Sequence, residues 1–176
     1  ILQLLDLSNE RITASRLDNL LSNPSIQSQQ QINQDEINEL TRCLQKTGFR
    51  WGLDAQEKEG VYDNSLNWCL ERWLLGLVFH SKIGFAPGGL APFSDGIQTT
   101  KIIKWWNLLS IITNQLQELR RPKSCREWIE LLTKILQESF REGGDWSWEY
   151  SLILEVLEDW RQIASNCQLK LTSDVV

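Results

Sequence analysis

Apolar residues recur along this chain at intervals of three and four positions, the spacing of one face of an α-helix. No run alternates between apolar and polar residues as a half-buried strand does. The pattern predicts helices over residues 1–7, 16–21, 33–47, 64–80, 97–121, 124–143 and 145–163. We therefore expect an all-α fold, a helical bundle of about five to seven helices.

The segments between these helices differ in composition. Residues 25–31 follow a proline and are rich in Ser and Gln, so we expect an exposed connection there. Residues 84–96 are rich in Gly and Pro and should form the longest loop. We expect N-terminal helices over 1–48, a main bundle over 49–165 that forms one domain with them, and a tail over 166–176.

Several helix ends carry recognisable signals. Asn33 with Glu36, and Ser124 with Glu127, are spaced as capping boxes. Gly48 is typical of the residue that ends a helix. Asp145 or Ser147 is expected to cap the last helix.

The chain opens at Ile1 inside an apolar stripe and has no Met in 176 residues, so we expect a domain from a longer polypeptide without a leader. Its longest apolar stretch, residues 74–79, is far shorter than the ~20 residues that cross a bilayer. We expect a soluble, cytoplasmic domain.

The net charge is −5, from 18 Lys and Arg against 23 Asp and Glu. Domains that bind DNA independently are usually basic, because contacts to phosphate supply most of their affinity. One basic cluster contains Arg120, Arg121, Lys123 and Arg126. It is a candidate DNA contact, although cations also stabilise the C-terminal end of a helix, which is the reading we prefer.

Catalytic and metal chemistry find little support in the sequence. Cys43, Cys69, Cys125 and Cys167 are widely spaced, and His80 is the single histidine, so we expect reduced core cysteines and no zinc site. The chain lacks the GxxxxGK[ST] loop that binds the phosphates of ATP. We expect no cofactor within this domain and no activity of its own.

Nine tryptophans are a heavy load for this length, and most fall on apolar stripes that predict a core. Trp106 continues the stripe of its helix. The neighbouring Trp105 is less easily placed, because adjacent helix positions do not share a face. A core position is the preferred interpretation of the tryptophans overall, and a surface that another domain covers is the second.

The segment GFRWGLD, residues 48–54, concentrates special residues outside any predicted helix. Arg50 can stack on Trp51 or pair with Asp54, and Gly52 can supply a positive φ angle. One interpretation is a turn that locks the first helices onto the bundle. The other makes Arg50 a phosphate contact and Trp51 a platform for a stacked base.

The order of several phrases resembles the RecC family, the gamma subunit of exodeoxyribonuclease V. Residues 4–7 (LLDL) and 11–21 (RITASRLDNLL) are similar to its LLDLP and RFTASxVLDLL phrases, and residues 48–54 to its GxRWGxD phrase. Residues 64–76 (NSLNWCLERWLLG) resemble NTWxFGLxRLLLG, with Arg72 and Gly76 in register. Residues 91–96 (APFSDG) resemble its following proline–aromatic–acidic phrase.

The chain departs from that pattern at Leu66, Trp68 and Cys69, where the family has Trp, Phe and Gly. These changes put local packing in doubt. The resemblance covers about residues 1–165 and implies a helical, 2B-like segment of a helicase-like subunit that has lost its ATPase motifs. It also implies RecB-like and RecD-like partner subunits that hold ATP and Mg, and contact with DNA through the assembled ATP-dependent helicase–nuclease.

Three functional hypotheses follow. The first is a non-catalytic structural or DNA-guiding domain of this recombination nuclease, with Arg50, Trp51, Gly52, Asp54, Arg72, Arg120 and Arg121 as structural or contact residues. The second is an unrelated helical protein-interaction module. The third is a small helical enzyme with an unrecognised site.

Overall fold

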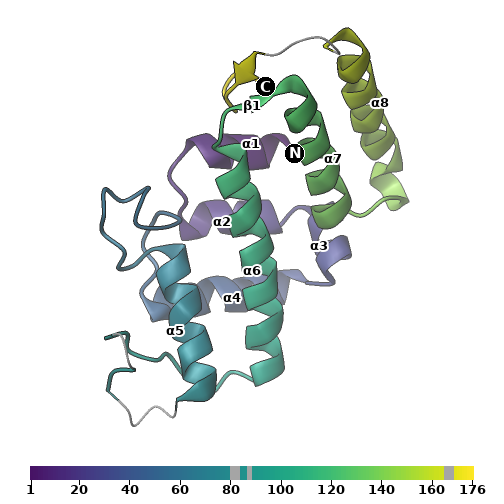
Figure 1. Cartoon of the computed structure of the whole chain (residues 1–176). Coiled ribbons are helices and arrows are strands. Elements are labelled where there is room, and N and C mark those ends of the chain that lie inside the picture. Colours follow the sequence, from purple (N-terminus) through teal and green to yellow (C-terminus); the bar gives the residue numbers. More distant parts are fainter. Residues whose placement is uncertain (80–83, 87–88, 165–168) are drawn as a thin grey trace. The chain divides into compact units, whose positions relative to one another are not determined.

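The computed structural model describes residues 1–79, 84–86, 89–164 and 169–176 (Figure 1). His80 and Cys167 lie outside these residues. The described residues form eight α-helices with two very short strands, which confirms the all-α class. The helices are α1 (Leu2–Asn9), α2 (Ala14–Leu21), α3 (Pro24–Gln30), α4 (Gln34–Thr47), α5 (Leu66–Val78), α6 (Thr99–Leu119), α7 (Cys125–Ser139) and α8 (Ser147–Ile163).

The chain divides into two compact units. The first contains Ile1–Glu10, Asn19–Asn33 and Asn114–Val176, and the second contains Arg11–Asp18 and Gln34–Thr113. Helices α2 and α6 contribute residues to both. Because the units are built from interleaved segments, they do not follow the boundaries at 48 and 165, and that domain division stays a prediction.

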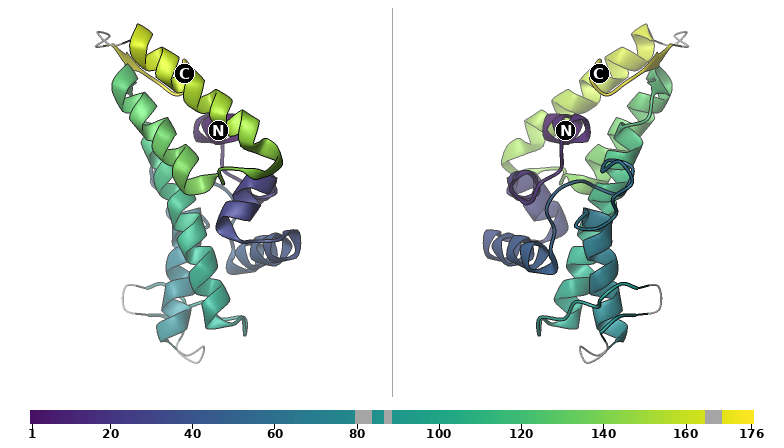
Figure 2. Two further views of the ribbon diagram at one scale, coloured as in Figure 1. Left: turned by 90° about the vertical axis from the view of Figure 1, so that its right-hand side faces the viewer. Right: turned by 90° about the vertical axis from the view of Figure 1, so that its left-hand side faces the viewer.

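The first unit is organised around α7. Helix α8 lies beside it, and α3 packs against it near its end (Figures 1 and 2). Strand β1 (Lys123–Ser124) pairs antiparallel with β2 (Lys170–Leu171). The indole N–H of Trp128 donates to the carbonyl of Leu171 at 2.9 Å, which anchors residues of the expected tail to this fully buried tryptophan in the first turn of α7.

The exposed connection expected over residues 25–31 is wrong, because helix α3 occupies most of it. Asn23 accepts hydrogen bonds from the backbone N–H groups of Ser25 and Ile26, and Pro24 stands in the first turn. Asn at the N-cap followed by Pro is a standard helix start, since the missing proline N–H needs no partner there. Ser25 and Ile26 are buried.

The starts of α7 and α8 contrast. Ser124 and Glu127 form the complete capping box that their spacing predicts. The cap expected at Asp145 or Ser147 is wrong: a 3₁₀ turn, Gly144–Trp146, precedes α8, whose N-cap is Trp146 without a side-chain bond. The N–H of Ser147 donates to the Gly144 carbonyl inside that turn. The backbone N–H at the start of α8 therefore has a partner without a side-chain cap.

The second unit is built on α4, α5 and the first part of α6. Trp73 of α5 and Trp105 of α6 meet with their ring centroids 6.3 Å apart, and both are fully buried. The preferred core position holds for Trp105, whereas the assignment of Trp106 to the buried stripe is wrong, because Trp106 is partly exposed. Ile102, Trp105 and Leu109 are spaced by three and four, so Trp105 fits the buried stripe better than Trp106 does.

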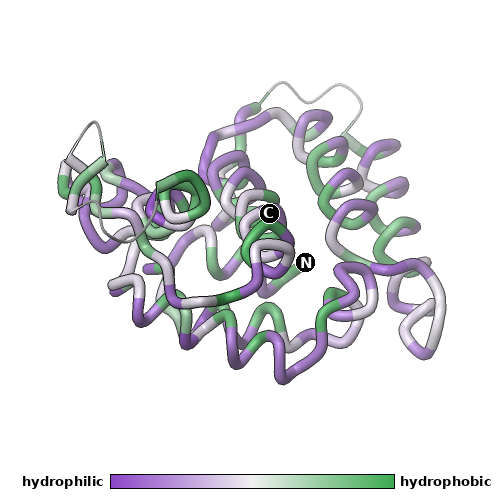
Figure 3. Tube along the Cα trace, turned by 90° about the horizontal axis from the view of Figure 1, so that it is seen from below, coloured by the Kyte–Doolittle hydropathy of each residue, from purple (hydrophilic) through white to green (hydrophobic). Residues whose placement is uncertain are grey.

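Two predicted apolar faces are only partly buried. On α5, Leu66, Leu70 and Trp73 are buried. Further along the same helix, Leu74, Leu77 and Val78 are exposed. On α8, the helical spacing of Trp148, Leu152 and Val156 also predicts a core face, yet these residues are exposed. Hydrophobic and hydrophilic positions alternate along the helical turns (Figure 3). None of the helices in the described residues is long and apolar enough to cross a membrane.

Candidate functional site

The segment after α4 folds back through two glycines. Gly48 adopts a φ of 107°, and the N–H of Phe49 donates to the Leu44 carbonyl, which ends the helix as its sequence predicts. Gly52 has a φ of 84°, and a Cβ there would lie 2.8 Å from Cγ of Lys58. Both backbone conformation and crowding therefore require glycine at position 52.

Gly52 links three segments of the second unit. Its N–H donates to the carbonyl of Ile12 at 2.8 Å, and its own carbonyl accepts the N–H of Leu66 at 2.9 Å. Beside it, Thr13 and Trp51 form an isolated antiparallel bridge. The segment thus joins residues 11–13 to the start of α5 through the backbone.

Two cations lie over the ring of Trp51. The guanidinium carbon of Arg11 is 4.8 Å and Nζ of Lys58 is 5.2 Å from the ring centroid. Arg50, the stacking partner considered from the sequence, is instead an exposed side chain. Lys58 is 7% exposed and donates to the carbonyl of Asp63, so it belongs to the packed side of this cluster.

Asp54 and Glu57 hold the turn that follows. The Asp54 carboxylate accepts the N–H groups of Gln56 at 2.9 Å and Glu57 at 3.1 Å. Glu57 accepts the N–H of Leu53 at 2.6 Å and that of Ile12 at 3.4 Å. Sequence reasoning missed Glu57, because its partner Ile12 lies 45 positions away and leaves no local signal.

Arg72 contacts three separate segments of the second unit. Its Nε donates to the carbonyl of Ala91 at 2.7 Å, and Nη1 donates to the carbonyl of Thr47. Its guanidinium carbon lies 4.5 Å from the centroid of the Trp68 ring. A planar, permanently charged group is suited to bond two carbonyls in its plane while stacking on an indole face.

Thr47, like Glu57, is a residue that the sequence did not single out. Its hydroxyl donates to the Cys43 carbonyl at 2.8 Å and accepts the indole N–H of Trp73 at 2.6 Å. Its carbonyl is in the last turn of α4, where a guanidinium also offsets the negative end of the helix dipole.

Gly76 allows a close backbone approach. A Cβ at this position would lie 1.9 Å from the carbonyl oxygen of Phe93. The N–H of Phe93 donates to the carbonyl of Arg72 at 3.0 Å. The APF phrase therefore packs on α5 against the two residues, Arg72 and Gly76, that are in register with the related phrase.

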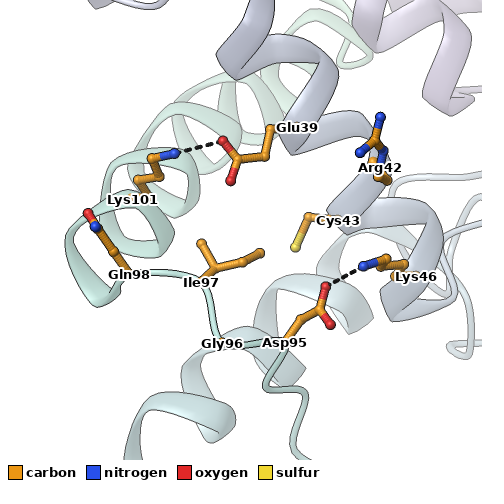
Figure 4. A pocket seen from close by; sticks show the side chains of 9 residues that line it. All are labelled: Glu39, Arg42, Cys43, Lys46, Asp95, Gly96, Ile97, Gln98 and Lys101. Atoms are coloured by element: carbon orange, nitrogen blue, oxygen red, sulfur yellow. Dashed lines mark hydrogen bonds and ion pairs between the residues drawn. The ribbon is translucent and has the colours of Figure 1, made fainter.

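A pocket of about 400 Å³ lies between α4 and residues 95–101 (Figure 4). Two ion pairs cross it, Lys46 with Asp95 and Lys101 with Glu39, each at 2.7 Å. These pairs neutralise the charges of four lining side chains, and Arg42 is the remaining charged residue of the lining. Burial raises the pKa of the Cys43 thiol to about 12, which leaves it a protonated, weak nucleophile at neutral pH.

The basic cluster belongs to the first unit, and partners occupy its cations. Arg120 donates to the Ser8 carbonyl at 3.0 Å. Arg121 pairs with Glu118 at 2.6 Å, and Lys123 donates to the Glu118 carbonyl at 2.5 Å. Arg126 pairs with Glu130 at 2.9 Å. This arrangement agrees with a stabilised helix end.

Cys43, Cys69 and Cys125 are buried free thiols, in agreement with the expected reduced core residues. In the part of the chain that the structure describes, no group of three or more His, Cys, Asp or Glu side chains is placed to hold a metal ion. The residues brought together are thus Arg72 with the Thr47 and Ala91 carbonyls, and Trp51 with Arg11 and Lys58.

Comparison with known proteins gives a consistent result. The family described as RecBCD enzyme subunit RecC fourth domain matches residues 1–176. The RecBCD enzyme subunit RecC of Buchnera aphidicola subsp. Baizongia pistaciae is 25% identical over 182 residues, covering 99% of this chain and 16% of that protein. Its counterpart from B. aphidicola subsp. Acyrthosiphon pisum is 21% identical over 184 residues, covering 99% and 17%.

The RecC subunit of Mycolicibacterium smegmatis is 21% identical over 151 residues, covering 82% of this chain and 14% of that protein. The chain thus spans about a sixth of the length of the curated relatives it matches. The family match covers the whole chain, including the Arg72 and Gly76 positions whose packing has just been described. The chain belongs to the RecC family and corresponds to the fourth domain of that RecBCD subunit.

Proposed function

We propose that this chain is a non-catalytic structural and DNA-guiding domain of a RecC-like subunit. In this proposal the subunit works within a RecBCD helicase–nuclease, exodeoxyribonuclease V, in double-strand break repair and homologous recombination. RecB-like and RecD-like subunits are its cytoplasmic partners and hold the ATP and Mg. The family assignment does not favour the alternative of an unrelated helical interaction module.

The observation that carries the structural part is the internal use of the family phrases. Arg72 bonds the carbonyls of Thr47 and Ala91, and Gly76 admits the backbone of Phe93. These contacts hold α4, α5 and residues 91–93 together. Residues that serve the fold in this way are expected in a domain that supports an enzyme rather than one that carries its chemistry.

The DNA-guiding part rests on Arg11, which lies over the ring of Trp51, and on Arg50, which precedes Trp51 in the chain. Both arginines are exposed, and Trp51 is only partly buried. A guanidinium beside an indole suits a phosphate contact next to a stacked base. The net charge of −5 argues against strong binding by the chain alone, so these residues are proposed to act only where the assembled complex brings DNA to them.

The test uses Arg50→Ala in the assembled helicase–nuclease, with Arg42→Ala as a control that removes another exposed arginine of the same unit. If Arg50 contacts phosphate, its removal weakens binding to forked duplex DNA and lowers the salt dependence of log K by about one unit. Arg42→Ala leaves both unchanged. Equal DNA affinity and unwinding in the two variants would refute the DNA-guiding part.

The non-catalytic part has a separate test. The purified 176-residue chain is expected to show neither DNA-stimulated ATP hydrolysis nor nuclease activity. An ATPase signal that co-purifies with the chain through successive columns and is lost on unfolding would contradict the proposal.

A further inference from the structure

Helix α8 is apolar on two sides. Tyr150 and Leu157 are buried, at 7% and 6% exposure. On the other side, Trp148 is 65%, Leu152 50%, Val156 57% and Ile163 86% exposed. At 3.6 residues per turn, these four positions fall within roughly 80° of one another around the helix axis, approximately opposite the buried pair. They are called here the outer face of α8.

A surface helix of a finished monomer shows one apolar stripe and a polar opposite face. The burial of Tyr150 and Leu157 accounts for the packing of α8 beside α7, visible in Figure 2. It leaves the outer face, with a largely exposed tryptophan, unexplained by the fold described here.

The charge around the outer face restricts what can cover it. Helix α8 contains Glu149, Glu155, Glu158 and Asp159 against one basic residue, Arg161. By the same helical spacing, Glu155 falls at the edge of the outer face and Asp159 falls within it, and both are exposed. A covering surface therefore has to combine apolar area with basic groups opposite these two carboxylates, since buried or crowded carboxylates need cationic partners.

This chemistry disfavours three other occupants. Two copies of α8 packed through their outer faces would bring Glu155 and Asp159 of one against those of the other. Helices that lie on membrane surfaces carry Lys and Arg on their polar side, whereas α8 is acidic. Nucleic acid is repelled by the same carboxylates.

The lengths of the relatives indicate a source for the occupant. The chain covers only 16% and 17% of the two Buchnera RecC proteins, so more than four fifths of each lies outside the match. Domains joined in one polypeptide meet at a high effective concentration, which favours docking within the chain over capture of a separate protein.

We infer that the outer face of α8 is an interdomain docking surface, covered by an apolar surface with basic groups on another domain of the same RecC-like polypeptide. The inference uses the family assignment and does not depend on the proposed guiding of DNA. It assigns Trp148, Leu152 and Val156 to the contact, with the basic groups of the partner domain opposite Glu155 and Asp159.

The test compares thiol labelling at two positions of α8. Val156→Cys places a thiol on the outer face, and Ser151→Cys is a near-isosteric control on an exposed flank of the same helix. Each variant is made in the 176-residue chain and in a RecC-like polypeptide that carries residues 1–176 among its other domains. Labelling is followed by peptide mass spectrometry, which separates these positions from the native cysteines, and circular dichroism verifies folding.

The expected result is that Val156→Cys is labelled at least about tenfold more slowly in the long polypeptide than in the 176-residue chain. Ser151→Cys is labelled at similar rates in both. Equally fast labelling of Val156→Cys in the two settings would overturn the inference. So would protection that requires an added RecB-like subunit, or protection in the 176-residue chain that accompanies a doubling of its mass.

Discussion

Two regions of the molecule differ in what covers them. The contact between residues 91–93 and α5 is closed within its own unit, whereas the outer face of α8 is exposed. On α5, Gly76 has no side chain, which allows the Phe93 backbone to approach the helix. Arg72 holds this segment in place with hydrogen bonds. On α8, Trp148, Leu152 and Val156 are large side chains with exposed surface. The first region is complete within its own unit. The second has the composition of an interface.

The largest expected effect is on the complete region. Gly76→Ala places a Cβ 1.9 Å from the Phe93 carbonyl oxygen, so residues 91–93 have to move away from α5. Alanine gains up to ~1 kcal/mol of helix propensity over glycine. Overpacking costs about 1–3 kcal/mol and occasionally more, and the displaced hydrogen bonds add to it. We predict a net loss of about 2–3 kcal/mol in urea unfolding.

Gly84→Ala is the matched control, because a Cβ there meets nothing within 4 Å. It should unfold at the wild-type urea concentration. If Gly76→Ala were as stable as this control, the packing of residues 91–93 on α5 described here would be incorrect.

A smaller effect is expected at the start of α7. Its cap lies outside both compared regions and therefore gives a reference value for the stability changes measured in them. Ser124→Ala removes the N-cap side chain and should cost about 1 kcal/mol at pH 7. The backbone N–H and hydroxyl of Ser124 lower the pKa of Glu127 in the folded state. Its contribution is therefore present above the ordinary glutamate pKa and is lost as the pH falls through the lower, folded-state value.

Urea unfolding of wild type and Glu127→Gln at pH 7 and pH 3 tests this sign. The stability difference between the two proteins should shrink at pH 3. A difference that grows on acidification would show that Glu127 does not act through its carboxylate.

The smallest expected effect concerns α8. In the 176-residue chain, Leu152→Gln should change stability by less than about 0.5 kcal/mol, because Leu152 is half exposed. Leu157→Gln, the same substitution on the buried side, should cost about 2–4 kcal/mol because it buries an amide and removes core contacts. Similar losses for both variants, measured by thermal melting, would show that the outer face is packed within this chain.

Local signals account for the parts of the fold that the sequence predicts. Gly48 ends α4, and Ser124 with Glu127 starts α7, because the chemistry of each lies within a few residues. The helical class follows from apolar spacing. The failures are of two kinds. Pro24 is typical of a position between helices, but it stands in the first turn of α3 and so begins a helix that the composition of residues 25–31 does not predict. On α6 and α8, two apolar stripes were available, and only tertiary packing selects between them.

The candidate site shows the same limit. Gly52 and Arg72 could be singled out from phrases of the sequence, but their partners could not. Arg11 reaches Trp51, and Glu57 reaches Ile12, across about 40 and 45 positions. Such pairs meet through the backbone pairing of residues 11–13 with 50–52. Neither segment has a periodic pattern of apolar residues that would predict this pairing.

The central claim is that the residues matching the RecC phrases hold this domain together, and Arg72→Lys tests it most directly. Lysine keeps the charge but cannot bond both carbonyls and stack on Trp68, so urea unfolding should show a loss of about 2 kcal/mol. Arg121→Lys, at an exposed ion pair, should unfold like the wild type. If Arg72→Lys also unfolds like the wild type while the assembled complex loses DNA binding, Arg72 is a contact residue and the structural account is contradicted.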